Sequence, residues 1–390
     1  MTAMPDGPAG KRQETVLVAI LGAAGLVSAA DNWIVAPILP PIAGDLGVTV
    51  ARAVTVLTAY MIPYGLLQPL HGFLSEGYGR LRLLRPLMLG LAAGTLGCAL
   101  APSLSWLCAG RCLTGLFAAG LIAVSLAAIG DRIPPARRQA AVGRFMGIVF
   151  LGQAIAVGLG GMVAEFLSWR TVFTLFTMLA LLVFGLLLRL PADHPRPATT
   201  GFMAELVRAL SDPRGRLVYS LAFVTGYLLL GLYGFAGAYL QQDGGLSPLQ
   251  AGAVLMLFGV ASLMAGSAVG PVSRRAGRQG VALLGAALGM TAAVMLACSS
   301  DWRIGVMAVM ALGLGYVFIQ STLATLAFDI GSSGLSSGLV GLGLFGGGGI
   351  SSAVGGVILA TAGYHLLWIA ATLGAAVLIV AILGCRGAFS

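Results

Sequence analysis

The chain has 390 residues, of which 58% are hydrophobic and only 9% charged, and its mean hydropathy is +0.97. A soluble domain carries about 25% charged residues, so this composition excludes an ordinary soluble protein. A helix needs about 20 mostly apolar residues to cross a membrane, and backbone polar groups cannot stay unpaired in lipid. Because the long apolar runs lack the alternation of a β-barrel, we expect an all-α integral membrane protein.

Hydropathy divides the chain into two sets of apolar runs separated by one polar segment. In the first half we expect spans over residues 15–39, 51–75, 84–103, 105–130, 139–164 and 169–190. In the second half we expect them over residues 217–240, 248–270, 280–299, 303–328, 337–361 and 365–383. The chain should therefore form about twelve transmembrane helices in two six-helix bundles, residues 1–190 and 217–390, joined by a cytoplasmic linker at 191–216.

The placement of the basic residues behind the net charge of +9 indicates how the chain is oriented in the membrane. If the N-terminus is cytoplasmic, the connections on that side collect most of the basic residues: Lys11, Arg12, Arg80, Arg82, Arg85, Arg132, Arg137, Arg138, Arg144, Arg189, Arg196, Arg208, Arg214, Arg216, Arg274, Arg275, Arg278 and Arg386. The opposite side has only Arg52, Arg170 and Arg303. This asymmetry follows the positive-inside rule. It predicts a multi-pass protein of the plasma (bacterial inner) membrane with both termini cytoplasmic, and it leaves no reason to expect a nucleic-acid partner.

The two halves of the sequence match each other at nearly constant offsets. A shift of 198 residues places Gly72–Arg80 on Gly270–Arg278, with Gly, Ser, Gly and Arg coinciding. A shift of 195 residues superimposes three further pairs: Gly160–Gly161 on Gly355–Gly356, Trp169 on Tyr364 and Phe173 on Trp368. These matches predict a duplicated six-helix unit, with two parallel halves related by an axis along the membrane normal.

Two ionisable residues lie deep inside predicted spans, Asp31 in the first and Arg111 in the fourth. Charged groups in the bilayer are costly and are functional candidates by default. Burial raises the pKa of a carboxyl group, so a carboxylate at this depth can take up and release a proton, with Arg111 as its fixed partner. We therefore assign Asp31 and Arg111 to proton coupling. The alternative is a structural ion pair that holds the two spans together.

Polar and aromatic side chains on several spans are candidates for lining a central cavity. On the second span Tyr60, Tyr64, Gln68 and His71 follow one helix face. The full set of expected substrate-binding residues is Asn32, Tyr60, Tyr64, Gln68, Gln153, Tyr227, Tyr233, Phe235, Tyr316 and Gln320. Interhelical hydrogen bonding or ordinary packing is the alternative for each of them.

The cysteines and the glycine run indicate packing rather than chemistry. The five cysteines lie in or at the ends of spans, so we expect neither a disulfide framework nor a metal site. Gly346–Gly349 lies in an apolar span without the Lys-Ser/Thr ending of a phosphate-binding loop, which indicates close helix approach. No nucleophile–base set is evident, so we expect neither a cofactor nor an enzyme.

Two loop and helix motifs resemble those of the major facilitator superfamily. Gly72–Arg80 (GFLSEGYGR) resembles the family's signature loop, with Glu76 where the family has Asp and Leu81 where a second basic residue is usual. Arg111–Gly115 (RCLTG) resembles the motif with an intramembrane arginine. The resemblance implies a major facilitator fold with two pseudo-symmetric six-helix bundles that work by alternating access.

The first and fifth spans resemble the twelve-span drug:proton antiporter branch of that family. Ser28–Pro40 carries the first-span likeness. Gly152–Gly161 is similar to the antiporter motif, except that Ala156–Val157 replaces its Gly-Pro pair. Proton-coupled efflux is therefore the implied activity, and the missing Gly-Pro leaves room for another transport mode.

The resemblance also implies which residues gate the transporter: Gly72, Glu76, Gly79, Arg80 and Asp131. We expect Glu76 to lie at the N-terminal end of the eleventh span, near Ser336–Ser337, where the helix dipole favours an anion. We expect Arg80 to pair with Asp131. Such contacts would hold the two halves closed on the cytoplasmic side.

Together these features predict proton-coupled efflux of lipophilic or cationic organic compounds by a monomer in the lipid bilayer. The partners would be a small organic substrate and protons. One alternative is a uniporter, symporter or exporter for a defined metabolite, such as a sugar or a biosynthetic product. A non-transporting membrane sensor or scaffold is the alternative from another class.

Overall fold

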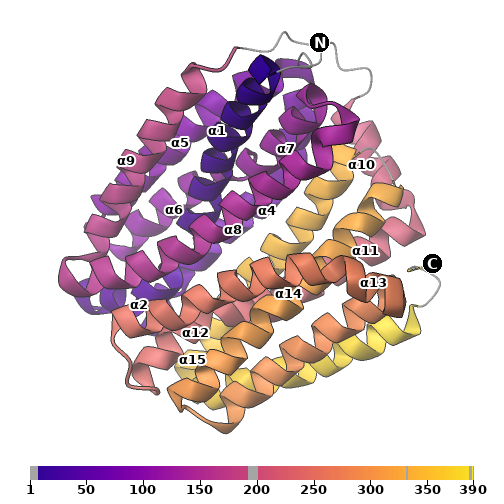
Figure 1. Ribbon diagram of the computed structural model, residues 1–390. Helices are drawn as coiled ribbons and strands as arrows, with labels where there is room; N and C mark the ends of the chain where they lie inside the picture. Colours follow the sequence, from indigo (N-terminus) through magenta and orange to yellow (C-terminus); the bar gives the residue numbers. More distant parts are fainter. Residues whose placement is uncertain (1–7, 192–200, 331–332, 386–388, 390) are drawn as a thin grey trace.

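The computed structural model describes residues 8–191, 201–330, 333–385 and 389, and within these ranges every regular element is a helix (Figure 1). The first half forms α1 (Pro8–Trp33), α2 (Val35–Asp45), α3 (Val50–Ala53), α4 (Thr55–Tyr78), α5 (Arg80–Ala99), α6 (Leu104–Ala118), α7 (Leu121–Arg132), α8 (Pro135–Phe166) and α9 (Trp169–Leu188). The second half forms α10 (Phe202–Ser211), α11 (Pro213–Thr225), the π-helix η1 (Gly226–Leu230), α12 (Gly231–Gln242), α13 (Pro248–Cys298), α14 (Trp302–Ile330) and α15 (Ser333–Gly384).

Ten of the described segments are long and apolar enough to cross a membrane, and two of these cross twice. The continuous helical assignments of α13 and α15 are broken at Gly277, with φ 70° and ψ 174°, and at Gly363, with φ 73° and ψ −176°. Glycine tolerates positive φ because it has no Cβ. Figure 1 shows the chain turning back at both breaks. The expected all-α fold with twelve crossings is thereby confirmed.

Short polar signals in the sequence explain where several helices begin. The hydroxyl of Ser168 accepts a hydrogen bond from the backbone N–H of Arg170 at the start of α9. Ser247 and Gln250 form a reciprocal capping box at the start of α13. Such caps satisfy backbone donors that a first helical turn leaves unpaired. These caps fix the residues at which α9 and α13 begin.

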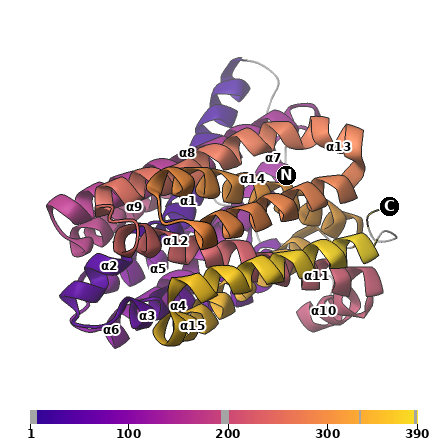
Figure 2. The same ribbon diagram turned by 90° about the horizontal axis from the view of Figure 1, so that it is seen from below.

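The helices form two bundles that meet along two long seams. In the first bundle α1 packs on α8, and α5 packs on α6 and α9; in the second, α13 packs on α14 and α11 on α15. The bundles meet where α4 lies along α15 and where α8 lies along α13 (Figures 1 and 2). Glycine permits the close approach at both seams: a Cβ on Gly65 would come within 2.9 Å of the backbone of Gly346, and one on Gly161 within 2.3 Å of Pro248 O.

The molecule has two ends, which differ in charge. We call the end that carries Arg80, Arg144 and Arg278 the arginine-rich end. The opposite end, with Asp45 and Glu165, is the arginine-poor end. At the arginine-poor end hydrogen bonds join the two bundles: Gln241 Nε2 donates to Pro37 O at 2.8 Å, and the N–H of Leu249 donates to Glu165 Oε2 at 2.8 Å. Towards the arginine-rich end α8 and α13 diverge (Figure 1).

The repeat inferred from the sequence is visible as matching side-chain contacts. Arg80 Nε lies 3.3 Å from Asp131 Oδ2, and Arg278 Nη1 lies 2.5 Å from Asp329 Oδ2. The matching ring pairs at the arginine-poor end have similar centroid distances, 6.0 Å for Trp169–Phe173 and 6.3 Å for Tyr364–Trp368. Both halves therefore use equivalent positions to fix the ends of their helices.

The segment expected to be a polar linker contains a helix. Residues 192–200 lie outside the described ranges, but α10 follows them and packs beside α11 and near the end of α15 (Figure 2). The next helix, α11, already begins at Pro213, before the expected boundary at residue 217. The division into residues 1–190, 191–216 and 217–390 remains a prediction.

Candidate functional site

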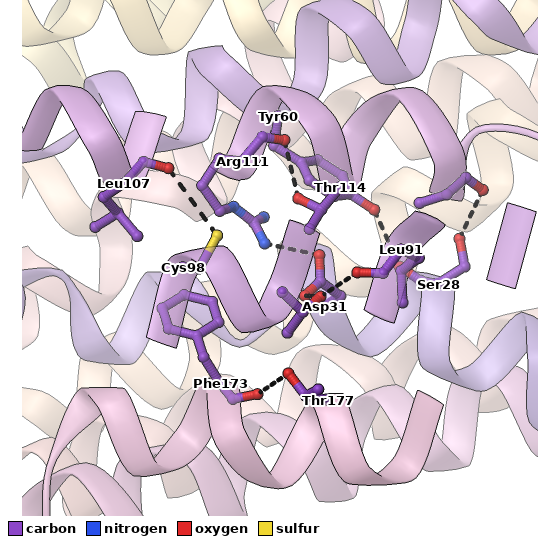
Figure 3. Close-up of polar contacts among 12 residues, drawn as sticks. Ser28, Asp31, Tyr60, Leu91, Cys98, Leu107, Arg111, Thr114, Phe173 and Thr177 are labelled. Carbon is purple, nitrogen blue, oxygen red and sulfur yellow. Dashed lines mark hydrogen bonds and ion pairs between the residues drawn. The ribbon is translucent and has the colours of Figure 1, made fainter. Parts of the chain in front are cut away.

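An ion pair lies in the interior of the first bundle. Arg111 Nη1 on α6 is 2.7 Å from Asp31 Oδ2 on α1, and both residues have an exposed fraction of 0% (Figure 3). Thr95 Oγ1 on α5 is 3.4 Å from Asp31 Oδ1 and 2.9 Å from the carbonyl oxygen of Leu91, so this hydroxyl can donate to either oxygen but not to both. The expected partner of Asp31, Arg111, is thus paired with it in this structure, and the role of the pair in proton coupling remains a prediction.

Aromatic rings cover the guanidinium of Arg111. Its Cζ atom lies 4.2 Å from the centroid of the Tyr60 ring on α4 and 5.9 Å from that of Phe173 on α9. The Tyr60 hydroxyl donates to the carbonyl oxygen of Ser28, one turn before Asp31 on α1. A cation over an aromatic face is stabilised by the ring quadrupole. Tyr60 therefore belongs to the surroundings of the ion pair in this structure, and its expected role in substrate binding remains a prediction.

The pair leaves part of Arg111 without partners. Among the described residues neither Nε nor Nη2 of Arg111 has a hydrogen-bond acceptor, although both atoms are buried. A buried guanidinium with unused donors is costly unless its counter-ion stays in place. The free energy of this site therefore depends strongly on Asp31 remaining charged or on water entering.

The two residues that follow Asp31, Asn32 and Trp33, have neighbours other than those of the ion pair. Both amide atoms of Asn32 are buried and lack a hydrogen-bond partner among the described residues. Trp33 ends α1 and packs across the bundle interface: its ring centroid lies 4.4 Å from Tyr233, 4.8 Å from Phe258 and 6.3 Å from Tyr316. Consecutive residues thus connect the ion pair of the first bundle to an aromatic cluster of the second.

The other expected lining residues have varied positions. The ring of Tyr64 lies 4.3 Å from that of Phe345 at the α4–α15 seam, and Gln68 packs in the same seam against Gly341. Phe235 is buried, and the end of its ring lies against Gly355 of α15 within the second bundle. Gln153 is buried on α8, whereas Tyr227 and Gln320 are half-buried. Tyr233 and Tyr316 are the candidates that the structure brings together with Trp33.

The expected gating residues gather at the start of α5. Arg80 contacts Asp131, the carbonyl oxygen of Gly72 at 3.5 Å, and the hydroxyl of Ser75. Arg80 Nη2 also lies 3.5 Å from Glu76 Oε1. Gly79, with φ 93°, provides the turn between α4 and α5. All these contacts lie within the first bundle.

Glu76 has a different partner from the one expected. Its side chain is half-exposed and its described ion pair is with Arg80, one turn away on the chain. Among the described hydrogen bonds none joins Glu76 to Ser336 or Ser337 at the start of α15. A nearby guanidinium offers a full charge, whereas a helix end offers only partial charge, so the ion pair prevails in this conformation.

Sequence reasoning missed a buried carboxylate at the arginine-rich end. Glu14 is 3% exposed, and its oxygens lie 2.6 Å from Arg144 Nη2 and 3.4 Å from Arg137 Nη1. It also missed Trp33 and Phe258, which look like ordinary apolar residues of their spans. Glu14 lies one position before the expected first span, and this closeness to the boundary is the only sign in the sequence that its side chain is buried.

A sequence model described as Major Facilitator Superfamily matches residues 21–336. The chain belongs to the major facilitator superfamily. The curated relatives similar to it include the uncharacterized MFS-type transporter YwfA of Bacillus subtilis, 28% identical over 74% of this chain and 71% of the relative. A chloramphenicol resistance protein of Streptomyces lividans is 28% identical over 80% of this chain and 78% of the relative.

The fold agrees with solved structures of this superfamily. A crystal structure of the nucleoside transporter NupG covers 97% of this chain and 100% of its own, with a TM-score of 0.79 and 12% sequence identity. At that identity the likeness concerns the fold alone. The protein is a multi-pass membrane transporter of the major facilitator superfamily, and its two halves carry the pseudo-symmetry that the superfamily's fold implies.

Proposed function

We propose that this transporter exports lipophilic or cationic organic compounds by alternating access in exchange for protons. The observation that carries the proposal is the buried ion pair of Asp31 and Arg111. The similarity to a chloramphenicol resistance protein supports an efflux role for the chain. A buried carboxylate that changes its protonation state between two conformations is sufficient to couple proton flow to substrate movement.

Proton uptake at Asp31 has to be linked to a conformational change. In this structure neither side chain is exposed, so a proton cannot reach the carboxylate directly. Neutralising Asp31 would leave the Arg111 guanidinium as an uncompensated buried charge, which costs about 3–5 kcal/mol. The protonated state would therefore favour an arrangement in which α1 and α6 separate enough for water to solvate Arg111. That dependence is the proposed energetic coupling.

The C-terminal end of α1 connects the ion pair to the residues that we propose bind the substrate. A shift of α1 that separates Asp31 from Arg111 also moves Trp33, which packs against Tyr233, Phe258 and Tyr316 in the other bundle. Aromatic faces attract flat apolar compounds and organic cations. The unpartnered amide of Asn32, next to both groups, could accept or donate a hydrogen bond to a substrate. We propose this aromatic cluster as the substrate site.

We further propose that the protein lies in a bacterial inner membrane with its arginine-rich end in the cytoplasm. The positive-inside asymmetry supports this orientation. Single cysteines at Asp243 and Asp301, introduced into a protein without native cysteines, should react with impermeant reagents added outside. Cysteines at Arg208 and at Arg196, which lies outside the described residues, should not. External reaction at Arg208 would reverse the proposed orientation.

A transporter for a defined metabolite, operating without protons, is the second candidate. It is favoured by α8, which runs unbroken from Pro135 to Phe166 through Ala156–Val157. The Gly-Pro pair that these residues replace would bend the helix, because proline removes a backbone hydrogen bond. Without that bend the α8–α13 seam can be tightly packed, as it is where Ala154 meets Gly259.

Transport in proteoliposomes separates the two candidates. Ethidium and chloramphenicol serve as cationic and neutral probes, with and without an imposed pH gradient. Proton-coupled efflux predicts uphill transport of at least one probe only when the gradient is present, and loss of this dependence in Asp31→Asn. If gradient-driven transport by folded Asp31→Asn protein equals that of the native protein, proton coupling through Asp31 is wrong. Gradient-independent downhill flux in the native protein would favour the uniporter.

A further inference from the structure

A carboxylate of the first bundle is bound to the first turn of a helix in the second bundle. Glu165, near the C-terminal end of α8, accepts two hydrogen bonds through its Oε2 atom. One comes from the hydroxyl of Ser247 at 2.5 Å and the other from the backbone N–H of Leu249 at 2.8 Å. We call these two bonds the cross-bundle cap. The cap shares no residue with the buried ion pair or with the aromatic cluster described above.

The start of α13 explains why a carboxylate binds there. Pro248 occupies the first turn and has no N–H, and Ser247 accepts a hydrogen bond from the N–H of Gln250 at 3.3 Å. The Gln250 side chain in turn accepts from the N–H of Ser247 at 3.0 Å. A first helical turn has no internal acceptors for its N–H groups, so the N–H of Leu249 still needs an acceptor from outside α13. Glu165 supplies one, and the partial positive charge of a helix N-terminus favours its negative charge.

The backbones of α8 and α13 touch beside the cross-bundle cap. A Cβ on Gly161, one turn before Glu165, would clash with the carbonyl oxygen of Pro248. A Cβ on Gly252 would come within 3.0 Å of the carbonyl oxygen of Val157. The two helices diverge towards the arginine-rich end (Figure 1), so Glu165 lies at the closed end of their seam. Opening the arginine-poor end by separating α8 from α13 therefore breaks both bonds of Glu165.

We propose that Glu165 holds the arginine-poor end closed by capping α13 across the bundle interface, and thereby sets the ratio of open to closed conformations at that end. The proposal rests on the alternating access of the proposed function, but not on the identity of the substrate or on proton coupling at Asp31. When the bundles separate, water replaces the lost partners, so the contact contributes as much as an ordinary helix cap. Its removal should raise the open-to-closed ratio about fivefold.

The capping box provides a matched control for variants of Glu165. Glu165→Ala removes both bonds between the bundles, whereas Glu165→Gln keeps an acceptor oxygen without the charge and should have a smaller effect. Gln250→Ala weakens the same helical turn from within α13 and leaves both donors of Glu165 in place. Ser247→Ala removes one of these donors, so it should add little to the effect of Glu165→Ala on the ratio.

The test measures distances between spin labels in the full-length protein in lipid nanodiscs. Labels at Leu167 and Asp243, both exposed at the arginine-poor end, report on the first and second bundle respectively. Glu165→Ala should raise the ratio of the long to the short distance about fivefold, and Glu165→Gln about twofold. Gln250→Ala should lower the temperature of unfolding but keep the native ratio. Labels at Tyr78 and Ser337, at the opposite end, should show more of their short distance in Glu165→Ala.

Two results would overturn the role of Glu165 and leave the proposed transport intact. An unchanged ratio in folded Glu165→Ala and Glu165→Gln protein would show that Glu165 does not hold this end closed. An equal shift in Gln250→Ala would attribute the effect to fraying of α13 and not to the bonds between the bundles. A third result would refute alternating access itself: one and the same distance at the arginine-poor end in the native protein and every variant, with and without ethidium or a change of pH.

Discussion

Arg278 pairs with Asp329 across 2.5 Å at the arginine-rich end of the second bundle. The same pair, Arg80 with Asp131, occurs in the first bundle with the same separation along the chain. The surroundings differ, however. The helix that Arg80 caps, α4, packs against α15, with Pro69 close to Gly338. The equivalent segment of α13 diverges from α8 and lacks such a neighbour near Gly266. The repeated contact therefore lies beside a closely packed bundle interface in one half only.

The first prediction follows from this difference. Arg80→Ala should loosen the last turn of α4, because Arg80 bonds Gly72 and Ser75 there, and should thus widen the gap between α4 and α15. Spin labels at Tyr78 and Ser337 would report a longer distance. Arg278→Ala should leave that distance unchanged.

The control for this measurement is Arg82→Ala, which removes an exposed arginine two positions further along the chain. It should reproduce the native distance distribution. If Arg80→Ala gave the native distribution as well, Arg80 would fix only its local turn, and its gating role would be lost.

The second prediction concerns the aromatic cluster. Trp33→Ala should raise the apparent KM for ethidium several-fold, because a cation on an aromatic face gains about 0.5–2 kcal/mol. Trp33→Phe keeps a ring and should have a smaller effect. Trp302→Ala, which removes an exposed tryptophan, is the control. An unchanged KM in folded Trp33→Ala protein would exclude Trp33 from the substrate site.

The overall fold could be predicted from the sequence because membrane burial leaves a strong one-dimensional signal. Twenty apolar residues indicate a span whatever the neighbours are. The offset of 198 residues even placed Arg80 on Arg278, and the sequence indicated Asp131 as the partner of Arg80, although it did not indicate Asp329 as the partner of Arg278. These signals depend on composition and spacing, which the sequence contains directly.

Which way each side chain faces could not be predicted in the same manner. Tyr60 and Tyr64 share a face of α4, yet Tyr60 packs on Arg111 and Tyr64 on Phe345 of the other bundle. A membrane helix is apolar on all sides, because lipid and protein interior are equally apolar, so periodicity does not separate core from surface. The sequence did indicate Arg111 as the partner of Asp31, but the positions of Tyr60 and Phe173 over the guanidinium depend on how α4 and α9 pack in three dimensions.

The third prediction is a pH dependence at the arginine-poor end. Hydrogen bonding from Arg170, and from Trp169 Nε1 at 3.1 Å, lowers the pKa of Asp45 below its ordinary value. Asp45 therefore contributes its full stabilisation at pH values above the pKa of the unfolded state, about 3.9. It loses this stabilisation as the pH falls through the lower pKa of the folded state. Asp45→Asn should destabilise the protein by about 0–1 kcal/mol at pH 6, since the pair is half-exposed.

Thermal unfolding in detergent between pH 3 and pH 6 would measure this effect. The difference between native and Asp45→Asn protein should shrink as the pH falls, and Arg170→Gln should show the same trend. A difference that stays constant over this pH range would mean that Asp45 contributes by its shape and not by its charge.

The last prediction is a double-mutant cycle on the buried pair. Because Asp31 and Arg111 are both fully buried, Asp31→Asn leaves an isolated guanidinium and should cost about 3–5 kcal/mol of stability, as should Arg111→Gln. The double variant Asp31→Asn with Arg111→Gln removes both charges and should recover most of that loss. All three variants should lack pH-driven transport, because none of them retains both the titrating carboxylate and its counter-ion.

The double variant separates the structural role from the coupling role. If the pair only locks α1 to α6, restoring stability should also restore gradient-driven ethidium transport. If Asp31 carries the proton, the double variant should be stable and should move ethidium only down its gradient. Thermal unfolding together with transport in proteoliposomes gives both measurements on the same preparation. Gradient-driven transport at the native rate by the double variant would show that protons couple at another residue or not at all.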